Sequence, residues 1–318
     1  NSFQFQSKRN CDTKAQGYEA IKAAYKPSLK VILLSRQLGI PMIFGGMYDL
    51  SKSQDFWEDN VGITPLILKQ SNFVNYSFNV IFDSKAIQGD GSLGLVKVNE
   101  TYFELDGKPF YFSGTNNYYL WYKPWNQVEE VLSDTKAMNL SVIRTGGFCN
   151  GMWKEGFCFQ PSPGVYDENT FQRMDKIIKE AGDRGLKLMI PFVNNWDDFG
   201  GMCQYVRWCN ETIPDYNLCS PFDGPGTNGA IAHDAFYTNN CAKNLYKNYV
   251  AYFLNRTNTL TGIKYKDDPT IFAWQLANEP RARSDASGQT LYNWISEMSS
   301  FVKNIDNNHL LTTGEDGF

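Results

Sequence analysis

The most regular hydrophobic pattern in this chain is a short run that is apolar on both of its faces. Seven of the eight residues at 270–277 are β-branched, aromatic or aliphatic, and only Gln275 interrupts them. A run of this length without a polar face is typical of a strand buried on both sides in a parallel sheet. It must end before Pro280, which cannot donate a hydrogen bond to a sheet ladder. The pattern therefore predicts a buried strand with a carboxylate, Glu279, just beyond its C-terminal end.

Strand-like and helix-like runs alternate along the chain from about residue 108 onward. We expect strands at 108–116, 141–148, 186–194, 270–277 and 309–318. We expect helices at 124–140, 171–185, 240–258 and 289–308. This alternation is typical of βαβ units and a parallel sheet, and it predicts strands 1–5 of a (β/α)8 TIM barrel. A doubly wound sheet is the alternative, but no glycine-rich phosphate loop opens any of these helices.

Polar residues gather where the predicted strands end, which is where such barrels place their chemistry. The residues at these points are Asn116, Asn117, Arg144, Asn194, Asn195, Trp196, Asp197, Asp198, Asn278 and Glu279. Amide and guanidinium groups can hydrogen-bond sugar hydroxyls, and a carboxyl group half withdrawn from water can act as a proton donor. This pattern favours a carbohydrate site with Glu279 as its acid. The simpler interpretation is that Asn-Glu-Pro only ends a strand and begins a loop.

Aromatic residues make up 15% of the chain, which is more than core packing usually needs. The flat faces of several of them could pack against pyranose rings near the strand ends: Tyr118, Tyr119, Trp121, Trp153 and Trp196. Some of these rings could instead fill the space between the sheet and its helices.

Other kinds of chemistry find little support. The chain has two histidines, His233 and His309, so it offers no Ser-His-Asp candidate and no histidine cluster for zinc, and no Cys-x2–4-Cys pair either. A net charge of −4 does not attract nucleic acid or an anionic membrane surface. No apolar run approaches the ~18 residues of a membrane span. We therefore expect no metal, no nucleic-acid partner and no membrane.

Cysteines and glycosylation sequons favour a secreted, extracellular protein. Six of the seven cysteines lie in the predicted barrel part. Cys149–Cys158 and a pair within Cys203, Cys209 and Cys219 are plausible bridges, although the sequence leaves the connectivity open. Five Asn-x-Ser/Thr sequons occur, at Asn75, Asn99, Asn139, Asn210 and Asn255.

Several segments, in this order and at this spacing, carry a family resemblance. They are FYFSGTNNYYLWY (110–122), VIRTGGF (142–148), NNWDDFGG (194–201), YKDDPTIFAWQLANEPR (265–281) and SGQTLYNWISEMSSFV (287–302). From about residue 103 to 318 the chain resembles the endo-β-1,4-mannanases of glycoside hydrolase family 5, especially those of fungi and plants. The resemblance implies a barrel and retaining hydrolysis of internal bonds in mannan, glucomannan and galactomannan by two glutamates, without metal or cofactor. It also implies a secreted monomer whose partner is the polysaccharide.

By the Asn-Glu-Pro match, the resemblance makes Glu279 the acid/base, and Asn278 would bind the 2-hydroxyl of the substrate. Arg144 matches the arginine that positions the nucleophile. With Tyr119, Trp121, Asn194 and Trp196, these residues form the expected site.

The chain departs from the family pattern in several places. The nucleophile of the family ends the seventh strand, whereas this chain stops at the fifth, so we expect the nucleophile to be missing from it. Glu315 and Asp316 match a turn after the fifth strand and are poor substitutes. Gly146 and Tyr119 stand where tryptophans are usual, and Gln275 replaces a common glutamate without evident effect on the chemistry. The alternatives are a family 5 β-1,4-glucanase or an inactive mannan-binding fragment.

Residues 1–90 lie outside the resemblance and form an unassigned upstream segment. AIQGDGSLG (86–94) is a candidate linker, which predicts a domain boundary near residue 90. Residues 95–318 are expected to be the N-terminal part of the catalytic barrel.

Overall fold

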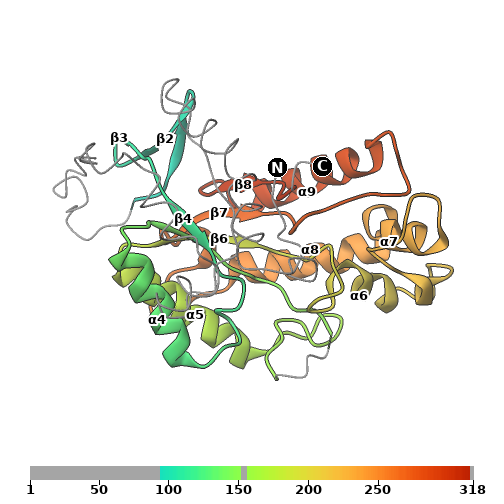
Figure 1. Ribbon diagram of the computed structural model, residues 1–318, viewed down its shortest axis with the longest axis horizontal. Coiled ribbons are helices and arrows are strands. Elements are labelled where there is room, and N and C mark those ends of the chain that lie inside the picture. The colour runs from blue at the N-terminus through green and yellow to red at the C-terminus, as the bar shows by residue number, and fades with distance from the viewer. Residues whose placement is uncertain (1–93, 152–155, 316–318) are drawn as a thin grey trace, which may run out of the picture. The chain divides into compact units, whose positions relative to one another are not determined.

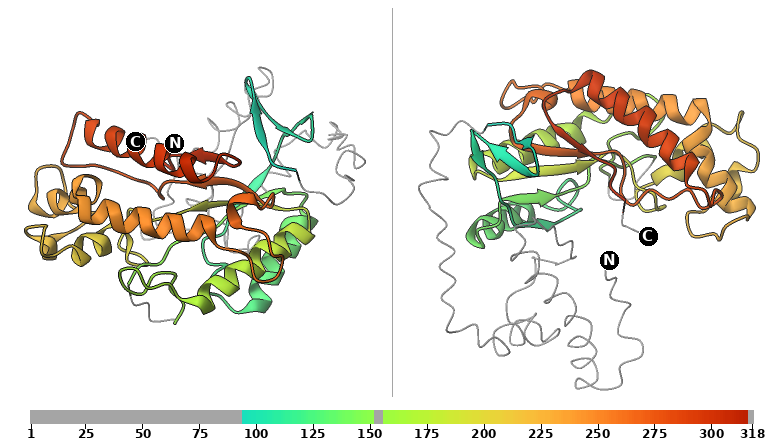
Figure 2. Two further views of the ribbon diagram at one scale, coloured as in Figure 1. Left: turned by 180° about the vertical axis from the view of Figure 1, so that it is seen from behind. Right: turned by 90° about the horizontal axis from the view of Figure 1, so that it is seen from above.

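The computed structural model describes residues 94–151 and 156–315. Within these, five strands form one parallel sheet in chain order (Figures 1 and 2). The strands are β4 (Gly114–Asn116), β5 (Val142–Arg144), β6 (Lys187–Pro191), β7 (Ile271–Gln275) and β8 (Leu310–Thr312). The main connecting helices are α4 (Trp125–Ala137), α5 (Glu168–Asp183), α8 (Asn240–Asn255) and α9 (Gln289–Ile305). The predicted order of these strands and helices is confirmed, and it matches the first four βα units and the fifth strand of a (β/α)8 barrel. The segment 1–90 lies outside the described residues.

The helices form because local signals and apolar spacing agree. Helix α5 begins after Asp167, whose carboxylate accepts a hydrogen bond from the Thr170 N–H at 2.7 Å. It buries Phe171, Ile177 and other residues three and four positions apart on one face. The helix therefore starts three residues earlier than the apolar pattern alone predicted.

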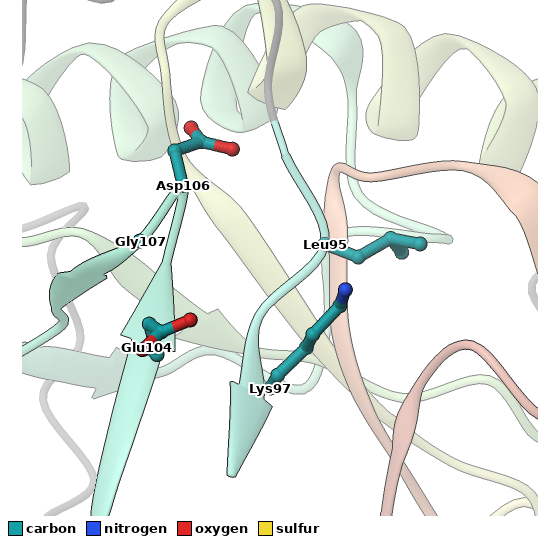
Figure 3. A pocket seen from close by; sticks show the side chains of 5 residues that line it. All are labelled: Leu95, Lys97, Glu104, Asp106 and Gly107. Atoms are coloured by element: carbon teal, nitrogen blue, oxygen red, sulfur yellow. The ribbon is translucent and has the colours of Figure 1, made fainter. Parts of the chain in front are cut away.

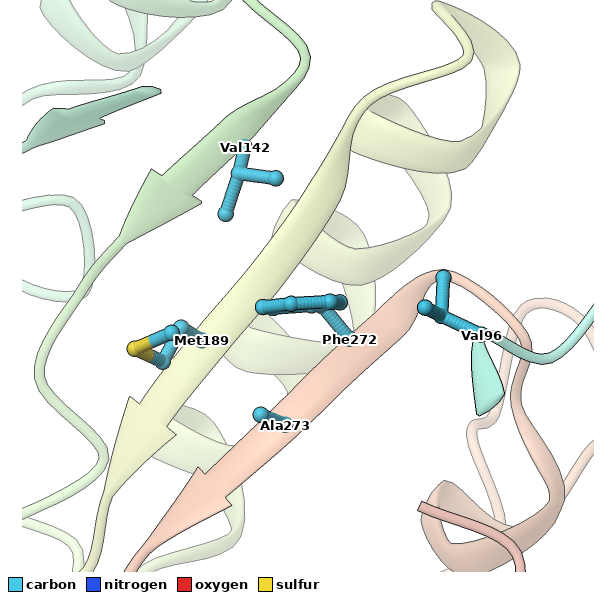
Figure 4. Packing of buried hydrophobic residues seen from close by; sticks show 5 residues of the cluster. All are labelled: Val96, Val142, Met189, Phe272 and Ala273. Carbon is cyan, nitrogen blue, oxygen red and sulfur yellow. The ribbon is translucent and has the colours of Figure 1, made fainter. Parts of the chain in front are cut away.

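The sheet is buried on both faces, as predicted for 270–277. On the inner face, residues of β5, β6 and β7 form a cluster with one residue that lies before Lys97: Val96, Val142, Met189, Phe272 and Ala273 (Figure 4). On the outer face, Trp274 stacks on Phe192 with ring centroids 5.3 Å apart and meets Phe253 of α8 at 5.9 Å. Strand β7 therefore joins two cores, which explains why it shows no polar face.

A small antiparallel sheet covers the inner cluster at the N-terminal ends of the barrel strands. It consists of β1 (Lys97–Asn99), β2 (Tyr102–Leu105) and β3 (Lys108–Pro109). The strand predicted at 108–116 is therefore wrong in its extent, because 108–109 pair with β2 and only 114–116 join the barrel. A turn with positive φ at Asp106 and Gly107 reverses the chain, and Phe103 packs edge-on against Phe272 at 5.4 Å.

The connection between β6 and β7 holds two helices that the sequence patterns did not predict. They are α6 (Gly201–Trp208) and α7 (Asn228–Thr238), with a short 3-10 helix at Tyr216–Leu218 between them. Helix α6 has only 8 residues, and α7 buries polar residues beside small ones, so it shows no clear apolar stripe. Disulfides Cys203–Cys219 and Cys209–Cys241 hold this excursion together. The expected Cys149–Cys158 bridge and a pair within Cys203, Cys209 and Cys219 are confirmed.

A buried ion pair joins α5 to the end of α8. Arg256 donates to both carboxylate oxygens of Asp175, at 2.9 and 2.7 Å, and to Glu168. Burial by itself raises the pKa of Asp175, but hydrogen bonds from Arg256, Tyr265 and Thr259 outweigh it and lower the pKa. Asp175 therefore stabilises the fold as an anion, and this stabilisation is lost as the pH falls through its depressed pKa.

We expect Arg256→Ala to lower the free energy of unfolding by about 3–5 kcal/mol, because it leaves a buried carboxylate without its cation. Denaturant unfolding of the full chain at neutral pH measures this change. Lys179→Ala is the control, since it removes only the exposed pair with Asp183, which water screens, and should change the stability far less. Equal losses in the two variants would contradict the assigned role of the buried pair.

Candidate active site

The register of the sheet brings the carboxyl ends of its strands to one edge. Asn116 at the end of β4 pairs with Arg144 at the end of β5. Beyond β6 and β7, Asn194 and Asn278 form a further parallel bridge. Side chains that are up to 134 positions apart in sequence therefore meet here.

Arg144 is the centre of this edge. Its guanidinium donates to the side-chain oxygens of Gln275 at 2.6 Å, Asn278 at 2.7 Å and Asn116 at 3.2 Å. These three acceptors are neutral amides. Burial lowers the pKa of Arg144, and the nearby charge of Glu279 partly offsets this effect. The guanidinium group of Arg144 is thus a cation withdrawn from water. Among the described residues it interacts electrostatically with the carboxylate of Glu279, although its hydrogen bonds go to the three amides.

Glu279 lies one residue beyond Asn278 in a left-handed backbone conformation, with φ of 54°. This conformation is uncommon for a residue with a side chain, and such outliers concentrate at functional sites. Its N–H donates to the carbonyl of Gly314 at 3.0 Å. A Cβ on Gly314 would lie 1.8 Å from the carbonyl oxygen of Ala277, so only glycine fits this close approach.

The carboxylate of Glu279 accepts a hydrogen bond from the indole Nε1 of Trp196 at 2.7 Å. Trp196 follows β6, and its ring is stacked on Phe222 at 5.1 Å. The guanidinium groups of Arg281 and Arg283 lie over the same ring at 5.4 and 5.9 Å. The indole is therefore fixed by contacts around its ring and holds the carboxylate through its N–H.

A second layer of polar contacts supports the segment that follows Glu279. Asn195 and Tyr237 accept hydrogen bonds from the backbone N–H of Arg281 at 3.1 and 3.0 Å. His233 contacts the carbonyl of Asn195 at 3.2 Å and the neighbouring Asp234 at 2.8 Å. Helix α7, which the sequence patterns missed, thus supports the site from behind, and His233 has a structural position there.

The structure brings together five of the predicted site residues: Arg144, Asn194, Trp196, Asn278 and Glu279. Tyr119 is half-buried on the loop after β4, beside Tyr118 and Tyr122. The prediction that Trp121 offers a flat face to a sugar needs correction, because its ring is 0% exposed. Trp121 instead packs among Tyr122, Phe159 and Phe199. Trp153 lies outside the described residues.

Gln275 was considered unimportant on sequence grounds, yet it accepts the shortest hydrogen bond from Arg144. A signal for this role exists in the pattern, since Gln275 is the one polar residue in an otherwise apolar strand. A polar group that is 8% exposed needs a partner, and the partner had to come from another strand.

The described residues hold no group of three His, Cys, Asp or Glu side chains placed to bind a metal ion. No helix among residues 94–151 and 156–315 combines the length and hydrophobicity that crossing a bilayer requires. A pocket of about 200 Å³ opens in the small antiparallel sheet, where Leu95 and Lys97 face Glu104 and Asp106 (Figure 3). It lies at the opposite end of the strands from Glu279, and it is shallow and charged, so we do not assign the chemistry to it.

Comparisons with known proteins agree on one family. Residues 94–318 match the model of the GH family 5 beta-mannosidase-like proteins. The chain belongs to this family. Mannan endo-1,4-beta-mannosidase 5 of Solanum lycopersicum is 46% identical over 230 residues, which are 71% of this chain and 51% of that protein. The family assignment accounts for the parallel strands and for the order of the segments described above.

Solved structures support the same assignment. An endo-1,4-beta-mannanase of Rhizomucor miehei is 39% identical with a TM-score of 0.60, and the match covers 71% of this chain and 62% of that one. An endo-beta-1,4-mannanase of Thermotoga petrophila is 41% identical with a TM-score of 0.58, over 67% of this chain and 44% of that one. The chain spans about half the length of the curated relatives that it matches.

We expect Arg144→Lys to lower the free energy of unfolding by about 1–3 kcal/mol, because one ammonium nitrogen cannot satisfy three amide acceptors in different directions. Denaturant unfolding of the full chain tests this. Arg207→Lys is the matched control, since Arg207 is 37% exposed and 3.8 Å from Asp197, and it should change stability by no more than about 0.5 kcal/mol. If both lysines are tolerated equally, the hydrogen-bond network of Arg144 does not stabilise this edge.

Proposed function

We propose that the whole protein is a mannan endo-1,4-β-mannosidase that hydrolyses internal bonds of mannan, glucomannan and galactomannan with retention of configuration. The observation that carries this proposal is Glu279 at the end of β7, hydrogen-bonded to Trp196 and beside the cation of Arg144. The names of the relatives support the choice of mannan. We further propose that the protein acts as a monomer.

In the proposed mechanism Glu279 is the acid/base. It protonates the glycosidic oxygen as the bond to the anomeric carbon breaks and a second carboxylate, the nucleophile, bonds that carbon. It then deprotonates the water that attacks the same carbon and displaces the nucleophile. The nucleophile would come from a part of the protein beyond Phe318, with its carboxyl group about 5 Å from that of Glu279. Arg144 supports this arrangement, because its positive charge is hydrogen-bonded to amides only and can stabilise a second carboxylate nearby.

Asn278 is proposed to bind a substrate hydroxyl. Its side-chain oxygen accepts from Arg144, and its Nδ2 donates to Asn194 at 2.8 Å. An amide nitrogen has two hydrogens, so one remains to donate to the 2-hydroxyl of the sugar. The two protein contacts fix the amide so that this hydrogen has a defined direction. Asn194, Trp196 and Tyr119 are proposed as further substrate contacts.

Two alternatives stay open. Gly146 stands where the family usually has tryptophan, and a Cβ there would lie 3.0 Å from Nε1 of the buried Trp121. The sugar surface near this position therefore differs from the usual one, which leaves a family 5 β-1,4-glucanase as the second candidate. The other alternative is a mannan-binding fragment without turnover.

We expect Glu279→Gln in the whole protein to lower kcat on mannan about 10²–10⁴-fold, because the amide cannot donate a proton to the leaving oxygen. An aryl mannoside with a dinitrophenolate leaving group is the internal control, since that group departs without protonation. Its bond-breaking step should be nearly unchanged, and added azide should rescue turnover by replacing the activated water. Retention of most of the rate on mannan would exclude Glu279 as the acid.

The wild-type whole protein distinguishes the two alternatives from the mannanase. Faster hydrolysis of carboxymethylcellulose than of mannan would favour the glucanase, and mannan binding without released reducing ends would favour the inactive fragment.

We propose that the protein is secreted and glycosylated. The three bridges among the described residues support an oxidising compartment. The sequon residues Asn139, Asn210 and Asn255 are exposed, whereas Asn99 is half-buried and its Nδ2 donates to Glu104 at 2.8 Å.

From a eukaryotic secretory host we expect glycans on Asn139, Asn210 and Asn255 and lower occupancy on Asn99, because the exposed positions leave room for a sugar. Peptide mass spectrometry after amidase removal of the glycans reads each site as an Asn-to-Asp conversion. A secreted protein without such conversions at the three exposed positions would contradict the prediction.

A further inference from the structure

Phe222 is an apolar ring that is exposed beside the candidate acid. It lies between the 3-10 helix at Tyr216–Leu218 and α7, and it is 64% exposed. Its ring is stacked on Trp196 with centroids 5.1 Å apart and planes 28° apart. Trp196 in turn donates to Glu279. A single indole therefore separates Phe222 from the carboxyl group at the centre of the site.

The ring is held in place although it is exposed. The disulfide Cys203–Cys219 anchors the chain three residues before it. Arg283, from the segment after Glu279, donates to the carbonyl oxygens of Phe222 and Asp223, each at 3.3 Å. The backbone N–H of Phe222 donates to the hydroxyl of Ser220 at 3.3 Å. An exposed aromatic residue on an anchored loop loses little conformational freedom when it binds a ligand, which favours binding.

Trp196 is only partly exposed, because Phe222 and the guanidinium groups of Arg281 and Arg283 contact its ring. The larger aromatic surface that a ligand can reach at this point is therefore that of Phe222. Its outer surface is hydrocarbon and carries no hydrogen-bonding group. The ligand that it suits has a flat C–H face with hydroxyls around the rim, which describes a pyranose ring.

We propose that Phe222 is a sugar-binding platform for a hexopyranose unit on the leaving-group side of the bond that is cleaved. This inference rests on the proposed function. The leaving-group side follows from the chemistry, because the acid contacts the oxygen that departs with the leaving sugars, and Phe222 adjoins the residue that holds this acid. The platform extends the site along the polysaccharide beyond the residues that contact the reacting bond.

The test is Phe222→Ala in the whole protein, with mannohexaose and a dinitrophenyl mannoside as substrates. We expect kcat/KM for mannohexaose to fall about tenfold, on the scale of one lost aromatic contact. The aryl mannoside has no sugar on the leaving-group side, so its kcat/KM should stay within about twofold of wild type. Phe222→Trp, which keeps a flat ring, should retain most of the rate on mannohexaose.

Tyr111→Ala is the matched control. Tyr111 is 68% exposed and precedes β4, at the opposite end of the sheet, so its loss should leave both substrates unaffected. An unchanged rate of Phe222→Ala on mannohexaose would overturn the platform. Equal losses on both substrates would overturn it as well, because Phe222 would then act by positioning Trp196 and Glu279.

The outcomes for the platform and for the proposed function are distinguishable. If wild type hydrolyses mannan and Glu279→Gln does not, the proposed function stands whatever Phe222→Ala does. If wild type fails to hydrolyse mannan or mannohexaose, the proposed function fails, and the platform proposal fails with it.

Discussion

The candidate site depends on the hydrogen bonds of one buried guanidinium group. Arg144 ends β5 and donates to Asn116 at the end of β4 and to Gln275 and Asn278 at the end of β7. It thereby ties together three strand ends that have no covalent connection nearby. Because its acceptors are neutral, the charge is not cancelled where it is bound. The same group that holds the edge of the sheet together therefore also places a positive charge beside Glu279.

The long excursion between β6 and β7 completes the site from the outside. It supplies Trp196 to the carboxylate and Asn195 to the segment that follows it. Two disulfides hold this excursion, so the contacts are positioned before any ligand arrives. The strained backbone of Glu279, with φ of 54°, is stabilised by contacts from both sides: Trp196 on the side chain and Gly314 on the backbone N–H. Glu279 is therefore supported both from the connection that follows β6 and from the loop that follows β8.

The hydrophobic cores explain why these strand ends are free for chemistry. Phe272 and its neighbours fill the N-terminal half of the inner face, and the small antiparallel sheet packs Phe103 against them. Trp274 and Phe253 fill the outer face. Packing is thus concentrated at one end and on the outside of the sheet. The opposite edge carries amides, a guanidinium group and a carboxylate. The hydrogen bonds that join Arg144 to Asn116, Gln275 and Asn278, and Asn278 to Asn194, offset the cost of burying these five side chains.

The sequence by itself determined the order of the five barrel strands and of four helices between them, the position of Glu279 beyond a buried strand, and the family. These properties depend on local periodicity, on a proline that ends a strand, and on segments that can be compared one by one. Only the tertiary structure decided which polar groups meet. Gln275 and Arg144 are 131 positions apart, and no local pattern predicts their contact. For the same reason the sequence did not predict the burial of Trp121 or the exposure of Phe222. Whether an aromatic ring lies in a core or faces solvent depends on neighbours that are distant in the chain.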